Sequence, residues 1–337
     1  MSRNVLAVER WTTERTEPTG AVLRWFSVQP APGGDMGGGR VTIRALVEEV
    51  AAALAPSAPG EARREAPRER REARREARDI IAALVDVPRL WSVTHADDAA
   101  DHVLIARAHA AVERRRRGMP FEYAVGRAAF RHLTLEVDER VLIPRPETEP
   151  LVDLVLAATD GGRGLAIDIG TGSGAIALAL ASEGRFERVV GTDVSSDALL
   201  VAAANARRVD GSVARRVEFR QGAYLAPVQG LRARAIVSNP PYISYAEASS
   251  LPASVREWEP AVALLSGAGG LAATRAIVDG SAAILEPGGV LALEADSGRA
   301  AEAAAIVAAD PRYAGVAVHT DLTGRDRFIM ATRSTRS

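Results

Sequence analysis

Residues 165–181 constrain the fold of this chain more than any other segment. The apolar run Leu165–Ile169 leads into Gly170-Thr171-Gly172-Ser173-Gly174, and alanine, isoleucine and leucine follow from Ala175 to Ala181. This order predicts a buried strand, a glycine turn and a helix, which is how a doubly wound nucleotide-binding fold begins. Because glycine has no Cβ, such a turn lets a ligand approach the backbone closely. We therefore expect an α/β fold with a mostly parallel sheet.

The glycine turn alone does not choose the ligand. Gly170 to Ala175 fits the dinucleotide pattern G-x-G-x-x-G/A, so nicotinamide, flavin and other adenosine ligands all stay open. A second predicted strand, Arg188–Thr192, ends in Asp193, which follows Gly170 by 23 residues. A carboxylate there can accept hydrogen bonds from both ribose hydroxyls, in NAD and in S-adenosylmethionine sites alike. The alternative role for Asp193 is to cap the helix expected to begin near Ser196.

A third predicted strand, Ala233–Ser238, runs into Asn239-Pro240-Pro241-Tyr242. The two prolines fix φ at about −65° and remove two backbone donors, and Pro240 keeps Asn239 out of the helical region. The turn therefore presents two acceptors, the side-chain oxygen of Asn239 and the carbonyl of Pro240, which can receive both hydrogens of an NH2 group. Hydride transfer has no need for such a grip, so the turn favours methyl transfer to nitrogen over hydride transfer. The other alternative is that these four residues are an ordinary proline-rich loop exit.

Three further segments carry a family resemblance. They are Val141-Leu142-Ile143-Pro144-Arg145-Pro146-Glu147-Thr148-Glu149, Pro120-Phe121-Glu122-Tyr123-Ala124-Val125-Gly126 and Glu259-Pro260-Ala261-Val262-Ala263-Leu264. Together with the glycine turn, the acidic residue and the Asn-Pro-Pro-Tyr turn, in that order, they make the chain resemble the HemK/PrmC family of release factor glutamine methyltransferases. The resemblance covers about residues 118–332.

The resemblance implies a class I S-adenosylmethionine methyltransferase fold, Rossmann-like, with a seven-stranded mostly parallel sheet and a small helical N-terminal domain. It implies methylation of the side-chain amide nitrogen of the glutamine in the Gly-Gly-Gln loop of class 1 peptide chain release factors. The alternatives are a glutamine of a ribosomal protein and an exocyclic adenine amine in nucleic acid. An adenosine-binding protein without catalysis is a further class, but it would predict a broken acceptor turn.

Candidate site residues follow from these motifs. The residues expected to act on the substrate amide are Asn239, Pro240, Pro241 and Tyr242, with Tyr242 covering the flat amide and helping to exclude water. The residues expected at the cofactor are Asp168, Gly170, Thr171, Gly172, Ser173, Gly174, Asp193, Tyr224 and Asn239. No general base is required, since the proton can leave after transfer.

Some positions are open or depart from the family pattern. Arg145, Pro146, Glu147 and Thr148 are expected to border the methionine end of the cofactor, with an Arg145–Glu147 ion pair as the alternative. Ala223, beside Tyr224, cannot hydrogen-bond the adenine amine. Arg131-His132 replaces part of a Phe-x-Gly turn, and the glycine usual after Leu293-Glu294 is displaced to Gly298.

Composition excludes several classes. The chain has 337 residues, enough for two domains with cores, and a net charge of −1 gives no overall attraction to nucleic acid. It has no cysteine, which excludes disulfides, thiolate zinc sites and cysteine nucleophiles and suits a reducing cytoplasm. No stretch approaches 18 apolar residues and no signal peptide is visible, so we expect a cytoplasmic protein that needs neither membrane nor direct nucleic-acid contact.

Four regions are expected along the chain. Residues 1–40 form an extension with a flexible, glycine-rich end, and residues 41–118 form a helical substrate-docking domain. Residues 119–148 form a β-hairpin connector, and residues 149–337 the methyltransferase domain. In the helical region we expect helices over Val41–Leu54, Arg68–Leu84 and Ala99–Arg117.

Two charged segments and three histidines have ordinary explanations. The Arg- and Glu-rich segment 61–79, with pairs at i,i+3 spacing such as Glu72/Arg75, favours a solvated helix over a ribosome or tRNA contact. Arg114–Arg117 suits the end of a helix. His95, His102 and His109 are seven residues apart, which on one helix places them about 10 Å from each other, too far to bind one metal ion. We expect no metal site.

Overall fold

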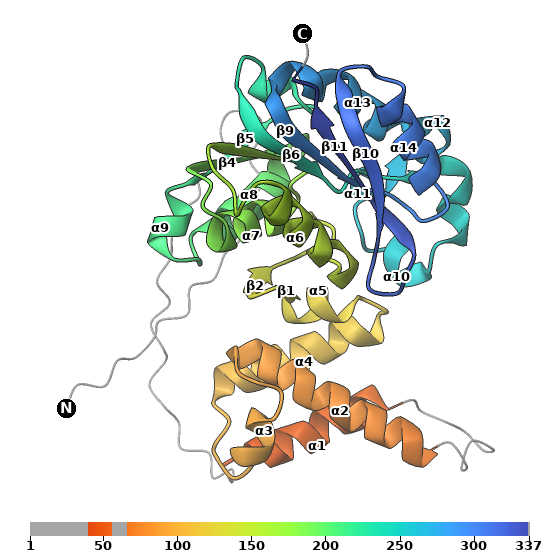
Figure 1. Cartoon of the computed structure of the whole chain (residues 1–337). Coiled ribbons are helices and arrows are strands. Elements are labelled where there is room, and N and C mark those ends of the chain that lie inside the picture. Colours follow the sequence, from red (N-terminus) through yellow and green to blue (C-terminus); the bar gives the residue numbers. More distant parts are fainter. Residues whose placement is uncertain (1–39, 56–65, 336–337) are drawn as a thin grey trace, which may run out of the picture. The chain divides into compact units, whose positions relative to one another are not determined.

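The computed structural model describes residues 40–55 and 66–335 (Figure 1). The described residues from Val41 onward cluster as one unit by contact. The predicted extension, apart from Arg40, lies outside the described residues, and so do Glu61–Glu65 of the charged segment. Among the helices of the described ranges, none combines the length and the apolar character needed to cross a membrane.

A seven-stranded sheet forms the centre of the C-terminal part, in the order β10-β11-β9-β6-β3-β4-β5. Its strands are β3 (Leu165–Ile169), β4 (Arg188–Asp193), β5 (Val217–Gln221), β6 (Ala233–Ser238), β9 (Leu285–Glu294), β10 (Tyr313–Thr320) and β11 (Asp326–Arg333). Strands β5, β4, β3, β6 and β9 are parallel, whereas β11 is antiparallel to both of its neighbours. The predicted fold class, a mostly parallel seven-stranded sheet, is confirmed.

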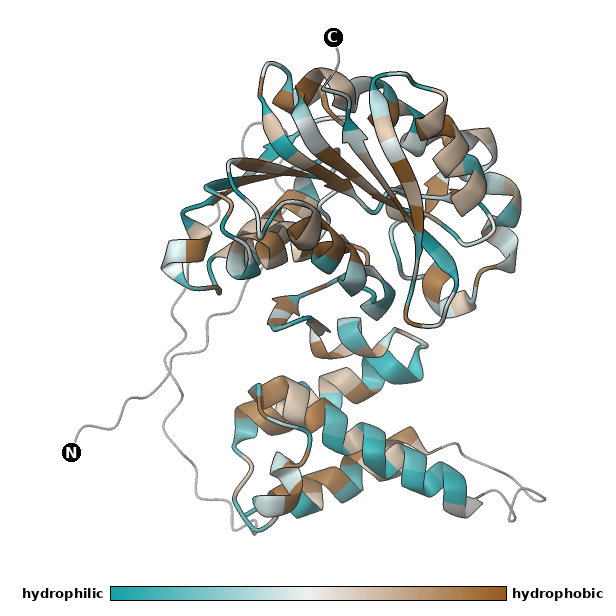
Figure 2. Ribbon diagram, viewed as in Figure 1, coloured by the Kyte–Doolittle hydropathy of each residue, from teal (hydrophilic) through white to brown (hydrophobic). Residues whose placement is uncertain are grey.

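Both faces of the sheet are covered, which explains why its central strands are apolar throughout. In β3 the alternation of side chains sends Ala166 into one core and Ile167 into the other. Helices α6 (Glu149–Ala158) and α7 (Ala175–Glu183) pack on the first face. Helices α13 (Ala272–Ile284) and α14 (Ala300–Ala308) pack on the second. Figure 2 shows hydrophobic residues along the sheet strands between these layers.

The strand order places the predicted motifs together. Strand β3 lies between β4 and β6, so the chain leaves β3 toward one side of the sheet and returns to pair on the other. Such a switch point opens a crevice at the carboxyl ends of the strands. Gly170, Asp193 and Asn239 lie at the ends of these three strands, which is why segments far apart in the sequence share one site.

The helical segment has a core of its own. It consists of α1 (Ile43–Leu54), α2 (Ala66–Val85), α3 (Trp91–Thr94) and α4 (His102–Arg116), with side chains such as Leu46, Ile80 and Ala108 fully buried between them. Helix α2 exposes a hydrophilic face (Figure 2). There Glu72 pairs with Arg68 at i,i+4. Glu72 thus takes the partner four residues before it rather than Arg75, because side chains three and four positions apart are both within reach on one face of a helix.

A short connector follows. Helix α5 (Phe121–Val125) ends at Gly126 in the left-handed conformation, and β1 (Arg127–Phe130) and β2 (Leu133–Glu136) pair as an antiparallel hairpin. Its turn holds Arg131 at φ 54°, and the guanidinium group of Arg131 contacts Glu183 and Asp153. Thus Arg131 ties the hairpin to α6 and α7. It lies in the turn in which the family pattern is Phe-x-Gly and this chain has Phe130-Arg131-His132.

Short elements complete the chain. They are η2 (Pro146–Thr148), α8 (Ser196–Ala206), α9 (Gly211–Ala214), η3 (Ala226–Val228), β7 (Ile243–Ser244), η4 (Tyr245–Ser250), α10 (Ala253–Arg256), α11 (Ala261–Leu264), β8 (Leu265–Ser266) and α12 (Gly267–Gly270). Strand β7 directly follows the Asn-Pro-Pro-Tyr turn and pairs in parallel with β8, apart from the main sheet.

Candidate functional site

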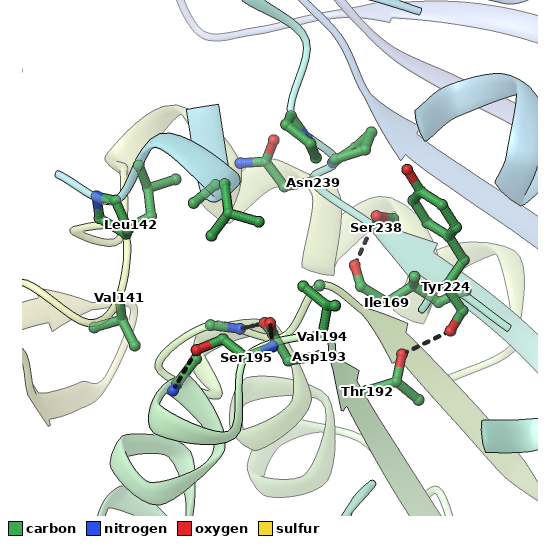
Figure 3. Close-up of a pocket in the computed structure, with 18 of the residues that line it drawn as sticks. Val141, Leu142, Ile169, Thr192, Asp193, Val194, Ser195, Tyr224, Ser238 and Asn239 are labelled. Carbon is green, nitrogen blue, oxygen red and sulfur yellow. Dashed lines mark hydrogen bonds between the residues drawn. The ribbon is translucent and has the colours of Figure 1, made fainter. Parts of the chain in front are cut away.

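A cavity of about 300 Å³ opens at the switch point of the sheet (Figure 3). The predicted residues among those that line it are Gly170, Gly172, Asp193, Tyr224, Asn239, Pro240 and Pro241. They come from the ends of β3, β4 and β6 and from the segment after β5. Thr171, Ser173 and Tyr242 line two smaller pockets instead, and Asp168 is buried behind the glycine turn.

The glycine turn leaves room for a ligand at two of its three glycines. Gly170 and Gly172 have φ of 72° and 53°, and a Cβ placed on either would meet no atom within 4 Å. Gly174 differs, because a Cβ there would lie 3.3 Å from the Cβ of Ala202 and 3.4 Å from the ring of Phe219. Gly170 and Gly172 therefore form an open cradle, whereas Gly174 allows α7 to pack closely.

Asp168 supports the glycine turn from behind. It is fully buried, and its Oδ2 accepts hydrogen bonds from Thr171 Oγ1 at 2.6 Å and from the backbone N–H of Ala177 at 3.1 Å. Burial raises the pKa of this carboxyl group to about 7, against the effect of those hydrogen bonds. Thr171 and Ser173 line a pocket of about 60 Å³ that Asn239 also borders.

Asp193 is held at the edge of the cavity by two backbone donors. Its Oδ2 accepts from Gly172 N and its Oδ1 from Ser195 N, each at 2.9 Å (Figure 3). The alternative role as a helix cap is wrong, because Ser195 caps α8 by accepting from Ala198 N at 3.1 Å. Each carboxylate oxygen has two lone-pair sites, so each keeps one for a ligand in the cavity.

The acceptor turn lies between two compartments. Asn239, Pro240 and Pro241 line the large cavity and also a pocket of about 110 Å³, which Tyr242 lines on the other side. Burial raises the pKa of Tyr242 to about 12, so its phenol stays protonated. The turn therefore borders both the large cavity and this smaller pocket.

Tyr224 borders the cavity in a strained conformation. Its φ is 47°, and its carbonyl accepts a hydrogen bond from Thr192 Oγ1 at 3.1 Å. A non-glycine residue costs energy in the left-handed region, so this hydrogen bond helps to hold the backbone there. The side chain of Tyr224 is partly exposed at the cavity edge, next to Ala223.

The arginine of the Ile-Pro-Arg-Pro segment pairs across the site. Arg145 Nη2 contacts the carboxylate of Glu259, whose side chain is 1% exposed. The predicted alternative, a pair with Glu147, is wrong, because Glu147 is exposed on η2 and the guanidinium group of Arg145 contacts Glu259 instead. Arg145 and Thr148 line the smallest pocket with Asn239, whereas Pro146 and Glu147 are exposed.

Comparisons with known proteins agree with this geometry. Residues 150–272 match the methyltransferase small domain, and residues 47–126 match the PrmC N-terminal domain. The release factor glutamine methyltransferase of Moorella thermoacetica is 44% identical over 224 residues, which are 66% of this chain and 78% of that protein. The one from Cereibacter sphaeroides is 38% identical over 289 residues, 86% of this chain and 96% of the relative.

The chain belongs to the release factor glutamine methyltransferase family. A third relative of that name, from Gloeobacter violaceus, is 40% identical over 227 residues, 66% of this chain and 78% of its own length. The resemblance drawn from the motifs is thereby confirmed, and so is the assignment to the methyltransferases.

In this family member, the structure adds residues that the motifs did not reveal. Glu294 ends β9 with a side chain 1% exposed, and Arg327 on β11 lies 3.8 Å from it. Arg327 Nε also donates to Asp321 at 2.8 Å. The only sequence signal was a glutamate directly after a buried apolar strand, where an unpaired carboxylate is costly. Only the folded structure shows that Glu294 lies near Thr148 and Tyr242.

Two of the three histidines considered for a metal site, His95 and His109, contact other side chains instead. The rings of His95 and Trp91 stack with centroids 4.6 Å apart, and His109 Nε2 lies 2.9 Å from Glu49. Within residues 40–55 and 66–335, no group of three or more His, Asp or Glu side chains is placed to hold a metal ion.

Proposed function

We propose that this protein transfers the methyl group of S-adenosylmethionine to the side-chain amide nitrogen of the glutamine in the Gly-Gly-Gln loop of class 1 peptide chain release factors. The observation that carries the proposal is the position of Asn239 and Pro240, which line both the large cavity and the smaller pocket beside it. A donor in one compartment and an acceptor in the other would meet at this turn.

The large cavity fits the cofactor in three respects. Gly170 and Gly172 leave an open cradle for its amino-acid and ribose portion. Asp193 offers one free lone pair on each carboxylate oxygen to the ribose hydroxyls, and Tyr224 borders the space for the base. Arg145 and Thr148 line the pocket of about 60 Å³ beside this cavity, where the methionine end would reach. S-adenosylmethionine supplies a methyl group activated by its sulfonium charge.

The acceptor turn compensates for a poor nucleophile. The lone pair of an amide nitrogen is delocalised into its carbonyl, so the enzyme must orient that nitrogen. The Asn239 side-chain oxygen and the Pro240 carbonyl accept its two hydrogens and stabilise the positive charge that develops on it. The buried Tyr242 forms a wall of the smaller pocket and excludes water. The nitrogen gains the methyl group and loses one proton after transfer.

The remaining parts of the proposal concern the partner. Residues 41–118 dock the release factor, residues 119–148 connect this helical part to the methyltransferase domain of residues 149–337, and the reaction takes place in the cytoplasm. The helical part supplies the physical basis for docking as a separate region, because its buried side chains pack with one another. The hairpin instead buries Phe130 and Leu135 in the core of the methyltransferase domain, which is what a connector to that domain requires.

The test uses the full-length protein with labelled S-adenosylmethionine and a release factor, followed by mass-spectrometric mapping of the methylated residue. The matched control is the same factor with the glutamine of its Gly-Gly-Gln loop replaced by alanine. We expect one methyl group on that glutamine and none on the control. Equal labelling of both factors, or labelling of a ribosomal protein or nucleic acid in preference, would contradict the assignment.

A further inference from the structure

The side-chain amide of Asn239 can serve the proposed reaction in only one of its two orientations. An asparagine presents an oxygen acceptor on one side and an NH2 donor on the other. An NH2 group turned toward a substrate NH2 would place donor against donor. Some neighbour must therefore select the orientation with the oxygen toward the substrate.

Thr148 is the neighbour in contact with this amide. Asn239 Nδ2 donates a hydrogen bond to Thr148 Oγ1 at 3.1 Å, and Thr148 is 4% exposed. A hydroxyl has one hydrogen, so Oγ1 can only accept from Asn239 if that hydrogen is used elsewhere. With the hydrogen free, the hydroxyl could equally donate to the amide oxygen and hold the wrong orientation.

The buried carboxyl group of Glu294 lacks such a hydrogen, since its Oε2 has no hydrogen-bond partner within the described residues. Glu294 lies at the end of β9, where burial raises the pKa of its carboxyl group to about 7 against the opposing effect of the neighbouring Thr148 hydroxyl. Arg327 Nη1 lies 3.8 Å from the other oxygen, Oε1, which is beyond hydrogen-bond distance. An ionised carboxylate only accepts, so a Thr148 hydroxyl turned toward Oε2 could only donate to it.

The position of Thr148 in the chain makes this contact informative. Thr148 is the residue before α6, where a threonine ordinarily accepts a hydrogen bond from the helix backbone. Here its side chain makes no such bond. The reasons are local: Thr148 ends η2 with a helical backbone (φ −83°, ψ −19°) rather than the extended one of a capping residue, and Pro150 at the second position of α6 has no N–H to give. The hydroxyl accepts from Asn239 Nδ2 instead.

We propose that Thr148, held by Glu294, is a positioning residue that keeps the nitrogen of the Asn239 amide away from the substrate and its oxygen toward it. The inference rests on the proposed role of Asn239 as an acceptor of the substrate amide hydrogens. Thr148 acts through Asn239, and Glu294 acts through Thr148.

The test compares Thr148→Val, which keeps the shape and loses the hydroxyl, with Thr148→Ser, which keeps the hydroxyl. At about pH 8, above the pKa of Glu294 near 7, single-turnover methylation by Thr148→Val should fall by a factor on the order of 10, as for one lost orienting hydrogen bond. Thr148→Ser should stay within about threefold of wild type. Because Thr148 also lines the pocket proposed for the methionine end, the S-adenosylmethionine affinity of each variant is measured separately and the rates are compared at saturating cofactor.

A double-mutant cycle separates this role from a structural one. In an Asn239→Ala background, Thr148→Val should have less than about a twofold further effect, because it has no amide left to orient. A wild-type rate for Thr148→Val would overturn the inference, and so would a loss of equal size in both backgrounds or no rescue by serine. Thr148→Ala, with thermal unfolding measured for every variant, replaces Thr148→Val if that protein does not fold. A normal rate for Asn239→Ala would overturn the proposed function itself.

Discussion

Arg145 and Glu259 form an ion pair across 114 residues of sequence, and it joins the segment before α6 to the segment after the Asn-Pro-Pro-Tyr turn. The Glu259 side chain is 1% exposed and that of Arg145 is 33% exposed. A buried carboxylate that loses its partner is costly, whereas the intact pair contributes little by itself. Its effect is to fix the two loops that border the smallest pockets of the site.

Removing this arginine should destabilise the protein. Arg145→Ala leaves the Glu259 carboxylate buried without its cation, and we expect the free energy of unfolding to fall by about 2–4 kcal/mol in chemical denaturation. Arg145→Ala combined with Glu259→Gln should recover part of the loss. The control is Arg68→Ala on α2, whose pair with Glu72 is exposed and should matter by less than about 1 kcal/mol. Similar losses for both arginines would refute the buried-pair interpretation.

Gly270 should be needed for the position of Tyr242. Its φ is 95°, and a Cβ there would overlap the carbonyl oxygen of Tyr242. Gly270→Ala should therefore displace the acceptor turn and lower turnover by a factor on the order of 10 or more. Gly269→Ala is the matched control, because Gly269 has φ 68° with no atom within 4 Å and should show only backbone strain of about 1–2 kcal/mol. Equal activity of the two variants would contradict this.

Asp193 should contribute to cofactor binding. Asp193→Ala removes a carboxylate that two backbone N–H groups hold at the cavity edge. We expect S-adenosylmethionine to bind more weakly by about 1–3 kcal/mol, measured by calorimetry. Asp197→Ala, on the exposed surface of α8, is the control and should bind as wild type does. Unchanged affinity in Asp193→Ala would remove this residue from the site.

The buried Glu294 should make stability depend on pH. Its pKa is raised from 4.5 to about 7 in the folded protein, chiefly by burial. The folded state therefore holds this proton more tightly than the unfolded state, and stability falls as pH rises from about 4.5 to about 7. Relative to Glu294→Gln, the wild type should lose roughly 3 kcal/mol over that range and no more above it. The pKa of Asp168 is raised in the same direction, but Asp168 is present in both proteins, so its contribution cancels in the difference between them. A difference that does not vary with pH would contradict the assignment.

The fold was predictable because its signals are local. Strands β3 and β6 begin and end where the apolar runs Leu165–Ile169 and Ala233–Ser238 do. Strand β4 extends the predicted run by one residue, to Asp193. Each of these strands is buried, so hydrophobicity alone marked it, and the turn residues that follow marked its end.

The site was predictable in part. The sequence predicted hydrogen-bond acceptors and an acidic residue at the strand ends. It did not predict which side chains contact and hold these residues. Thr148 and Asn239 are 91 residues apart, and Arg145 and Glu259 are 114 apart. Such pairs depend on which loops the fold brings together, so a local pattern suggested Glu147 as the partner of Arg145 instead. Gly174 likewise matched a ligand motif, although its neighbours Ala202 and Phe219 come from distant segments.

The most direct test of the account is single-turnover methylation of a release factor by Asn239→Ala, with S-adenosylmethionine affinity measured on the same protein. Asn239 is proposed to accept a hydrogen from the substrate amide, so the rate should fall by a factor on the order of 100 or more, as for a lost transition-state hydrogen bond, while cofactor affinity changes little. A normal rate, or a loss explained wholly by weaker cofactor binding, would contradict the central claim.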